Sequence, residues 1–420
     1  MSQITLLLVQ IIVILVAARI IGWGFRKIHQ PQVIGEMTAG ILLGPSLLGW
    51  VAPGFSAVLF PADSLPFLSV LSQIGLLLFM FLVGLELNPS LLRKRSHTAV
   101  LTSHASIFIP FLLGALLSLY LYPRLSDSSV PFTHFALFMG TAMSITAFPV
   151  LARILTERRL LRTPLGGVAI ACAAVDDVTA WCILAGVVLL VRATGGHLLW
   201  LTILGSLVYI AVMLSFGRKA LRHLEARYRR RGEVSKDMIA VILLIVVASS
   251  LATEMLGIHA LFGAFLVGAI MPKDNHFVRT LTEKLEDVTV VLLLPLFFSF
   301  TGLRTSMGLV SGSQMWFYCG LIITVAVVGK FGGASVAARI SGMKWSEASA
   351  VGVLMNTRGL VELVVLNIGL DIGVISPALF AMMVIMALTT TFMTTPLLDL
   401  IHPRTFTLVD TGVIPIKKAA

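Results

Sequence analysis

Apolar stretches of about 20 residues recur along almost the whole chain. The first reads ITLLLVQIIVILVAARII, at residues 4–21. A helix of about 20 apolar residues crosses the hydrocarbon core of a bilayer, where only helices and closed barrels satisfy their own backbone polar groups. The alternation typical of barrel strands is absent from these stretches. The sequence therefore predicts an all-α polytopic membrane protein.

The composition agrees with a chain that is mostly embedded in lipid. Hydrophobic residues make up 57% of it and charged residues 12%, about half the charged share of a soluble domain. The first apolar stretch has no basic segment before it and no cleavage site of small residues, so we expect a retained helix rather than a signal peptide. The three cysteines lack CxxC spacing, which disfavours disulfides and zinc sites. No cofactor is predicted.

The apolar runs are best divided into thirteen membrane spans. The predicted spans are residues 3–22, 32–50, 67–87, 98–122, 133–155, 164–192, 199–216, 235–255, 257–272, 286–303, 315–339, 346–370 and 376–398. This division can be tested against the loops, because short cytoplasmic loops carry an excess of Lys and Arg.

Basic residues concentrate in every second loop of this arrangement. One set of loops, with the tail, contains Arg26, Lys27, Arg93, Lys94, Arg95, Arg153, Arg158, Arg159, Arg162, the basic segment from Arg218 to Lys236, Lys273, Arg279, Lys284, Arg339, Lys344, Lys417 and Lys418. The opposite set contains only Arg124, Arg192 and Arg304. The pattern predicts an outside N-terminus and a cytoplasmic C-terminus. The net charge of +11 thus reflects topology, and we expect the bilayer rather than nucleic acid as partner.

Two halves of about six spans flank the basic linker at 222–236, which suggests the inverted repeat common in secondary transporters. Such repeats place an interrupted helix at matching positions in each half. TAMSITAFPVLAR (141–153) contains Pro149, which removes a helix hydrogen bond, and LMNTRGLVELVV (354–365) contains Asn356 and Thr357. We predict that these two segments are the paired broken helices.

Charged side chains inside apolar spans are costly, so they are candidates for function. Asp176 and Asp177 lie near the centre of the sixth span, and Lys330 is the only lysine deep in any span. Adjacent helical residues point about 100° apart, so one aspartate can pair with Lys330 while the other faces a cavity. Carboxylate and hydroxyl oxygens suit Na⁺, Li⁺ or K⁺. We therefore interpret the pair as a shared proton and cation site.

Structural alternatives to these interpretations remain open. The aspartates could form a buried ion pair or hydrogen bonds between helices, and Lys330 could simply hold Asp176 in place. Arg358 and Glu362 are four residues apart, which lets them neutralise one another on a helix. For that second pair a structural ion pair is the favoured interpretation.

Seven segments resemble the monovalent cation:proton antiporter-2 family, most closely its Kef-type and plant cation/H⁺ exchanger branches. They cover nearly the whole chain in order: QPQVIGEMTAGILLGPSLLG (30–49), GLLLFMFLVGLELN (75–88), SITAFPVLARIL (144–155), VDDVTAW (175–181), HALFGAFLVGAIMP (259–272), PLFFSFTGLR (295–304) and NTRGLVELVVLNIG (356–369). The resemblance implies a homodimer with thirteen helices per subunit, two crossing broken helices and elevator-like alternating access.

By position in these motifs, Asp177 would be the main carboxylate for the monovalent cation and the proton. Asp176 would pair with Lys330, and Ser144 and Thr146 would lend oxygens. The resemblance also divides the chain: dimerisation-domain helices at 1–97 and 237–310, core helices at 98–192 and 311–400, a linker helix and basic loop at 193–236, and a short cytoplasmic tail at 401–420.

Two departures from the Kef pattern bear on function. No nucleotide-binding domain follows the membrane spans, and the Gln-Asp of Kef proteins is Asp-Asp here. Gating by glutathione or nucleotide is therefore not expected. The sequence predicts a transporter of the inner (plasma) membrane, not an enzyme, that exchanges Na⁺ or K⁺ for H⁺ and moves net charge. The alternatives are a sodium-coupled symporter of an organic anion and a sensor subunit that transports nothing.

Overall fold

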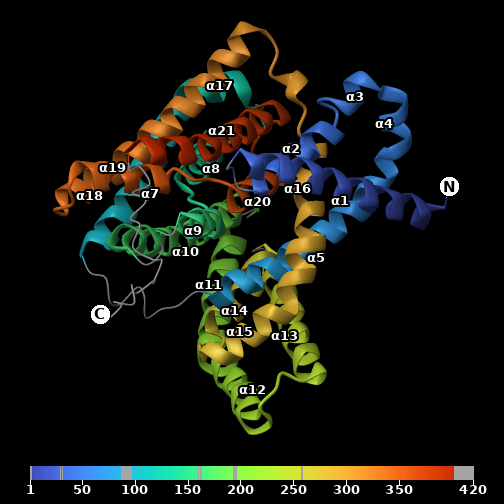
Figure 1. Ribbon diagram of the computed structural model, residues 1–420, viewed down its shortest axis with the longest axis vertical. Helices are drawn as coiled ribbons and strands as arrows, with labels where there is room; N and C mark the ends of the chain where they lie inside the picture. Colours follow the sequence, from blue (N-terminus) through green and yellow to red (C-terminus); the bar gives the residue numbers. More distant parts are fainter. Residues whose placement is uncertain are drawn as a thin grey trace, which may run out of the picture.

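The computed structural model describes residues 2–28, 30, 32–86, 97–127, 129–158, 160, 163–192, 196–256 and 259–401 (Figure 1). All regular secondary structure within these ranges is helical. Ten stretches of them are long and apolar enough to cross a membrane, which confirms an all-α polytopic protein. The basic loop at 93–95 and the predicted tail after Ile401 lie outside the described residues.

Three predicted spans are missing from those ten stretches. Two of them, 133–155 and 346–370, are the spans predicted to be broken, and each consists of two shorter helices. The third, 257–272, contains the eleven-residue apolar helix α14 (Ala260–Ile270). Every predicted span therefore has a helical counterpart, although the count of thirteen membrane crossings stays a prediction.

Local signals explain where several helices begin and end. Ser235 accepts a hydrogen bond from the N–H of Met238 and so caps α13 (Lys236–Met255). Pro164 begins α10 (Pro164–Arg192), a position where its missing N–H costs nothing. The basic helix α12 (Arg218–Arg231) ends at Gly232, whose φ of 74° places it in the left-handed region that favours glycine.

One set of helices packs around α5 and is called the α5 group here. Its members are α1 (Gln3–Lys27), α2 (Gln32–Leu43), α5 (Leu65–Glu86), α13, α14, α15 (Asn275–Glu286) and α16 (Leu294–Leu303). Helices α5 and α14 touch backbone to backbone, because a Cβ on Gly84 would lie 2.2 Å from the Phe265 carbonyl oxygen. Short elements α3 (Leu48–Val51), α4 (Pro53–Leu59), η1 (Ala62–Ser64), η3 (Asp287–Leu293) and η4 (Met307–Leu309) connect these helices to their neighbours.

A second set of helices packs around α10 and α7 and is called the α10 group. Its members are α7 (His97–Leu125), α8 (Phe132–Ser144), α9 (Phe148–Glu157), α10, α17 (Gly312–Val327), η5 (Val328–Gly332), α18 (Gly333–Ile340), α19 (Trp345–Met355), α20 (Leu360–Asp371) and α21 (Pro377–Ile401). Helix α11 (Gly196–Val212) continues through the π-helical turn η2 (Met213–Gly217) into α12, and the three together link the two groups along the chain.

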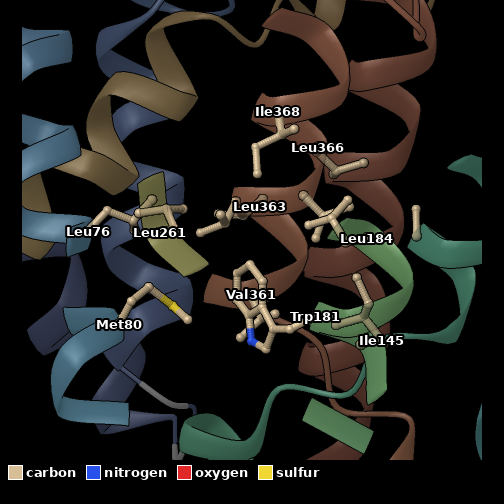
Figure 2. Close-up of a cluster of buried hydrophobic side chains, with 14 of the residues drawn as sticks. Leu76, Met80, Ile145, Trp181, Leu184, Leu261, Val361, Leu363, Leu366 and Ile368 are labelled. Carbon is tan, nitrogen blue, oxygen red and sulfur yellow. The ribbon is translucent and has the colours of Figure 1, made fainter. Parts of the chain in front are cut away.

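The two groups meet across a largely apolar surface. Figure 2 shows Leu76 and Met80 of α5, with Leu261 of α14, in one buried cluster with Trp181 of α10 and Val361 of α20. A polar link also joins the groups, since Arg304, just after α16, bonds to Asn367 and Asp371 of α20. The groups correspond broadly to the predicted dimerisation and core parts, whose boundaries stay a prediction.

Candidate functional site

The two broken helices meet at their interruptions. Helix α8 ends at Ser144, residues 145–147 are extended, and α9 begins at Phe148. In the other half, 356–359 separate α19 from α20. The N–H of Ala147 donates to the carbonyl of Thr357 at 3.0 Å. This backbone bond joins the two interruptions directly.

Pro149 lies two residues beyond the interruption at 145–147, inside the next helix. It is the second residue of α9, where backbone N–H groups have no acceptor within the helix. Proline is therefore accommodated at this position rather than responsible for the gap. Asn356 and Thr357 do lie in the second interruption, and their side-chain oxygens Oδ1 and Oγ1 are buried without a hydrogen-bond partner among the described residues.

Asp176 is fully buried and accepts four hydrogen bonds. Its Oδ1 accepts from the hydroxyl of Ser103 at 2.6 Å. Its Oδ2 accepts from Ser106 at 2.6 Å, from Thr146 at 2.8 Å and from the ammonium of Lys330 at 3.0 Å. Hydrogen bonds to an ionised carboxylate favour its charged form, so this environment suits an anion.

Lys330 lies in the π-helical turn η5, an irregularity that is frequent at functional sites. It is fully buried, and its Nζ bonds to Asp176 and to the carbonyl oxygens of Ser106 and Ser144. The bond from Lys330 to Ser144 is the contact between this lysine and the first broken helix. The Ser144 hydroxyl itself donates back to Thr141 at 2.8 Å, so the carbonyl is the oxygen that Ser144 offers to Lys330.

Asp177 has a different environment, although it is the next residue on α10. Its side chain is buried, with only 2% of the residue exposed. Neither of its oxygens has a hydrogen-bond partner among the described residues. The charges of Asp176 and Lys330 and the N–H of Phe148, at the start of α9, act on it electrostatically. A buried carboxylate without donors is unfavourable unless a proton or a cation neutralises it.

Arg358 and Glu362 form a second fully buried ion pair, at 2.9 Å. Arg358 also donates to the carbonyls of Ala142 at 2.8 Å and Met143 at 2.6 Å. Its backbone is bonded at N–H and carbonyl to the hydroxyl of Thr391 on α21. The pair predicted from spacing alone is therefore formed, and Arg358 also reaches the first broken helix.

Together, two cations of the second half neutralise the C-terminal end of α8. Arg358 takes the carbonyls of Ala142 and Met143, and Lys330 takes that of Ser144. The last carbonyls of a helix have no partner within it and carry the negative end of its dipole. The broken helix is stable inside the protein because these side chains replace the missing backbone donors.

Three residues that bond to this site were not predicted: Ser103 and Ser106 on α7 and Thr391 on α21. The segment LTSHASIF contained a usable signal, since serines three residues apart share one face of a helix. No cluster of three or more His, Cys, Asp or Glu residues exists within the described ranges. Oxygen atoms of Asp177 and the interruptions are the candidate ligands for a monovalent cation.

Comparison with known proteins identifies the family. The sodium/hydrogen exchanger, transmembrane, family matches residues 12–400. The Na(+)/H(+) antiporter NhaS4 of Synechocystis sp. is 47% identical over 403 residues, which is 96% of this chain and 98% of that protein. The chain therefore belongs to the sodium/hydrogen exchanger family, whose members are transporters and not enzymes.

Other relatives are longer than this chain. Cation/H(+) antiporter 17 of Arabidopsis thaliana is 42% identical over 93% of this chain and 48% of that protein. K(+)/H(+) antiporter 1 of Saccharomyces cerevisiae is 34% identical over 96% of this chain and 47% of that protein. The chain thus spans about half the length of both proteins.

A solved structure supports the fold. The sodium proton antiporter MjNhaP1 from Methanocaldococcus jannaschii superposes with a TM-score of 0.66, covering 95% of this chain and 97% of that one at 14% identity. At that identity the likeness shows the shared fold alone, and the predicted sodium/proton antiporter fold is thereby confirmed.

Proposed function

We propose that this chain exchanges a monovalent cation, Na⁺ or K⁺, for protons across a membrane, with Asp177 as the shared binding group. The observation that carries the proposal is the contrast on α10: Asp176 has four side-chain donors, whereas the buried Asp177 has no side-chain donor among the described residues and only the backbone N–H of Phe148 nearby. A carboxylate in that environment takes up a proton or a hard cation, and one excludes the other. This competition is what couples two opposite fluxes.

Relatives with matching sequence support this reading. NhaS4 is named a Na(+)/H(+) antiporter and the yeast relative a K(+)/H(+) antiporter, so both cations have precedents in the family. Oxygen ligands of carboxylate and hydroxyl type suit either ion. An organic anion as substrate is disfavoured, because the proposed binding group, Asp177, is itself anionic and Arg358 is already paired with Glu362.

Access alternates, in this proposal, by movement of the α10 group against the α5 group. The largely apolar contact between the groups (Figure 2) supports sliding, since its apolar part has no directional bonds, while the bonds from Arg304 to Asn367 and Asp371 would have to open. Exposed apolar residues along α1, such as Ile4, Leu8 and Ile12, provide a surface for lipid or for a second copy in a homodimer. The basic loops orient the N-terminus outside and the C-terminus toward the cytoplasm of a plasma membrane.

Lys330 determines whether the proposed exchange moves net charge across the membrane. Asp177 alone could exchange one cation for one proton without net charge. If Lys330 releases its proton during the cycle, Asp176 remains as a second negative charge and the exchange becomes electrogenic. The direct contact between Lys330 and Asp176 at 3.0 Å supports this coupling.

The test is cation-driven proton movement by the purified protein in proteoliposomes that contain a pH-sensitive dye. We expect at least one of Li⁺, Na⁺, K⁺ and Rb⁺ to dissipate an imposed proton gradient. Asp177→Asn should abolish the signal while remaining folded, because an amide cannot take up and release the proton. A wild type silent toward all four cations would reject antiport and favour a sensor subunit. Normal flux by Asp177→Asn would reject the site.

A further inference from the structure

Helix α12 carries a concentration of positive charge that the proposed exchange does not use. Its 14 residues include seven Arg or Lys side chains and a single acid, Glu225. An excess of basic residues in a short loop follows from the rule that orients membrane proteins. That rule specifies neither a folded helix nor the face on which the charges lie, so their arrangement can indicate a binding partner.

One face of α12 is attached to the rest of the protein. Tyr228 is buried and shares a hydrogen bond with His276 on α15. Arg229 forms ion pairs with Glu225 at 2.7 Å and with Asp274, the residue that caps α15, at 3.1 Å. These contacts fix α12 to the start of α15, and they neutralise the charge of Arg229.

The other basic side chains of α12 have no such neutralisation. Five of them are exposed and form no ion pair with the described residues: Arg218, Lys219, Arg222, Arg227 and Arg230. Outside the described ranges the sequence contains a single acidic residue, Asp410, which cannot neutralise five charges. Their counter-charge therefore comes from another molecule.

The first turn of α12 lies where the lipid-facing surface of the molecule ends. Helices α11, η2 and α12 follow one another without a break, and α12 lies at one end of the molecule (Figure 1). Leu207, Leu214 and Phe216 on this continuous helix are exposed, as expected for side chains that face hydrocarbon. The next large apolar side chain to be exposed among the described residues is Val241, on α13. The edge of the hydrocarbon therefore lies close to Phe216.

Distance from this edge divides the exposed charges of α12 into two sets. A helix rises about 1.5 Å per residue, so Arg218, Lys219 and Arg222 lie within about 9 Å of the edge along the helix axis. Arg227 and Arg230 lie about 16 and 21 Å from it. The polar headgroup layer is about 5–8 Å thick on each side of a bilayer. The first set is therefore level with the headgroups, and the second set lies beyond them.

We propose that Arg218, Lys219 and Arg222 bind the phosphate groups of anionic phospholipids in the leaflet from which α12 emerges. Each basic residue at a membrane surface attracts anionic lipid, and this attraction fades within a Debye length of about 8 Å. The bound lipids hold the end of the continuous helix, and α15 with it, at the surface of the bilayer. Lipid binding of this kind does not depend on the proposed antiport.

Binding is measured on the purified protein in detergent, by native mass spectrometry and by the melting temperature during titration with phosphatidylglycerol or phosphatidylcholine. We expect only phosphatidylglycerol to bind tightly and to stabilise the protein. Arg218→Gln with Arg222→Gln should weaken its binding about 25-fold, because each surface charge contributes about fivefold. Arg227→Gln with Arg230→Gln, the matched pair of equal charge, should weaken it a few-fold at most. Arg218→Lys with Arg222→Lys should retain it.

Four outcomes of this titration would overturn the proposal. Equal losses in the two Gln pairs, or no loss in either, would show that the headgroup-level charges are not special. Equal binding of phosphatidylcholine would exclude recognition of net charge. Equal stabilisation by inorganic phosphate would indicate a site for free anions. Loss of a dimer, rather than of bound lipid, in the first pair would assign this face to a second copy of the chain.

Depth in the bilayer provides a second measurement, which does not depend on lipid affinity. Ala220 and Ala226 are exposed on α12, and a cysteine at either position can carry a fluorophore in a background without the three native cysteines. A quencher attached to the lipid headgroup should strongly reduce emission from a label at Ala220 and only weakly that from Ala226. Equal quenching at both positions would contradict the placement of the first turn at headgroup level.

Discussion

Two fully buried ion pairs lie in the α10 group, with nearly the same separation but with different construction. Lys330 and Asp176, at 3.0 Å, are 154 residues apart in the chain, and the carboxylate also accepts from three hydroxyls. Arg358 and Glu362, at 2.9 Å, are four residues apart, and Glu362 has no side-chain donor besides Arg358 among the described residues. Each cation also donates to two backbone carbonyls, Lys330 to those of Ser106 and Ser144 and Arg358 to those of Ala142 and Met143.

The difference concerns what remains when a pair separates. Asp176 keeps three hydroxyl donors without Lys330, although the carbonyls of Ser106 and Ser144 lose theirs, so separation leaves no carboxylate without a donor. Loss of Arg358 leaves the carbonyls of Ala142 and Met143 and the carboxylate of Glu362 buried without their donor. The two pairs therefore differ in what their separation would cost. We expect the Lys330–Asp176 pair to separate more easily, and the Arg358–Glu362 pair to hold α20 against the end of α8.

Arg358→Gln should give the largest effect. Breaking a buried ion pair by removing one partner costs about 3–5 kcal/mol, and the α8 carbonyls lose their donors as well. We expect little folded protein, with a strongly lowered apparent melting temperature in detergent. Size-exclusion chromatography and thermal unfolding monitored by intrinsic fluorescence provide the measurement.

Arg279→Gln is the matched control for that experiment. Arg279 and Glu283 form the same four-residue Arg–Glu pair at 2.8 Å, but both side chains are more than half exposed. Exposed pairs contribute about 0–1 kcal/mol, so the melting temperature should barely move. Equal behaviour of Arg358→Gln and Arg279→Gln would show that burial is not what makes the first pair a fastening.

Lys330→Gln should leave the fold intact and change the electrical character of transport. Asp176 retains its three hydroxyl bonds, so we expect a folded protein whose exchange is weak or electroneutral. Solid-supported-membrane currents on the wild type and the variant measure net charge movement directly. A wild-type flux that does not respond to membrane potential would refute electrogenic exchange and leave Lys330 as a structural brace.

This contrast between the pairs was only partly predictable from the sequence. Charged residues stand out in apolar spans, which is why Asp176, Asp177, Lys330, Arg358 and Glu362 were found without a structure. The Arg358–Glu362 pair followed from spacing on one helix. That Lys330 pairs with one of the two aspartates was inferred because it is the only lysine deep in any span, and the choice of Asp176 was implied by the family resemblance.

The hydroxyl partners could not have been identified in the same way. The spacing of Ser103 and Ser106 predicts that they share a face of α7, but serines in membrane helices usually bond their own backbone, as Ser118 does, so the spacing does not reveal a carboxylate partner. The interruptions lie within the two predicted segments, but Pro149 is not in the gap itself. Proline marks the neighbourhood of an interruption, but it fits the first turn of the following helix as well as the gap itself.

If the Lys330–Asp176 pair opens during transport, a path for cations should reach the crossing of the two interruptions. Cysteine placed at Ala147 or Thr357, where the interruptions join, should react with a small hydrophilic thiol reagent, in a background without the three native cysteines. A saturating cation should slow the reaction several-fold. Ile12→Cys, on the exposed face of α1, serves as control, and equal rates at all three positions would argue against a cation path at the crossing.

Lys273, a half-buried cation, also joins two helix ends, but without a carboxylate partner. Lys273 follows α14 and donates to the carbonyls of Gly84 and Leu85, at the end of α5, and of Gly268 at 2.8–3.0 Å. It thereby ties two helix ends together as Arg358 does, but with neutral acceptors only. Lys273→Met removes those three bonds, so we expect a melting temperature lower by a few degrees, a smaller loss than for Arg358→Gln.

The pH dependence of that loss has a defined sign. Burial lowers the pKa of Lys273 from 10.5 to about 8, so between these values the unfolded chain binds a proton that the folded chain does not. Stability contributed by the wild-type lysine therefore rises with pH across this window, and the deficit of Lys273→Met should widen from pH 8 toward 10.5. Lys284→Met, on the exposed face of α15, should show no such widening. A deficit that does not widen over this window would mean that Lys273 stays charged in the fold, as Arg358 does.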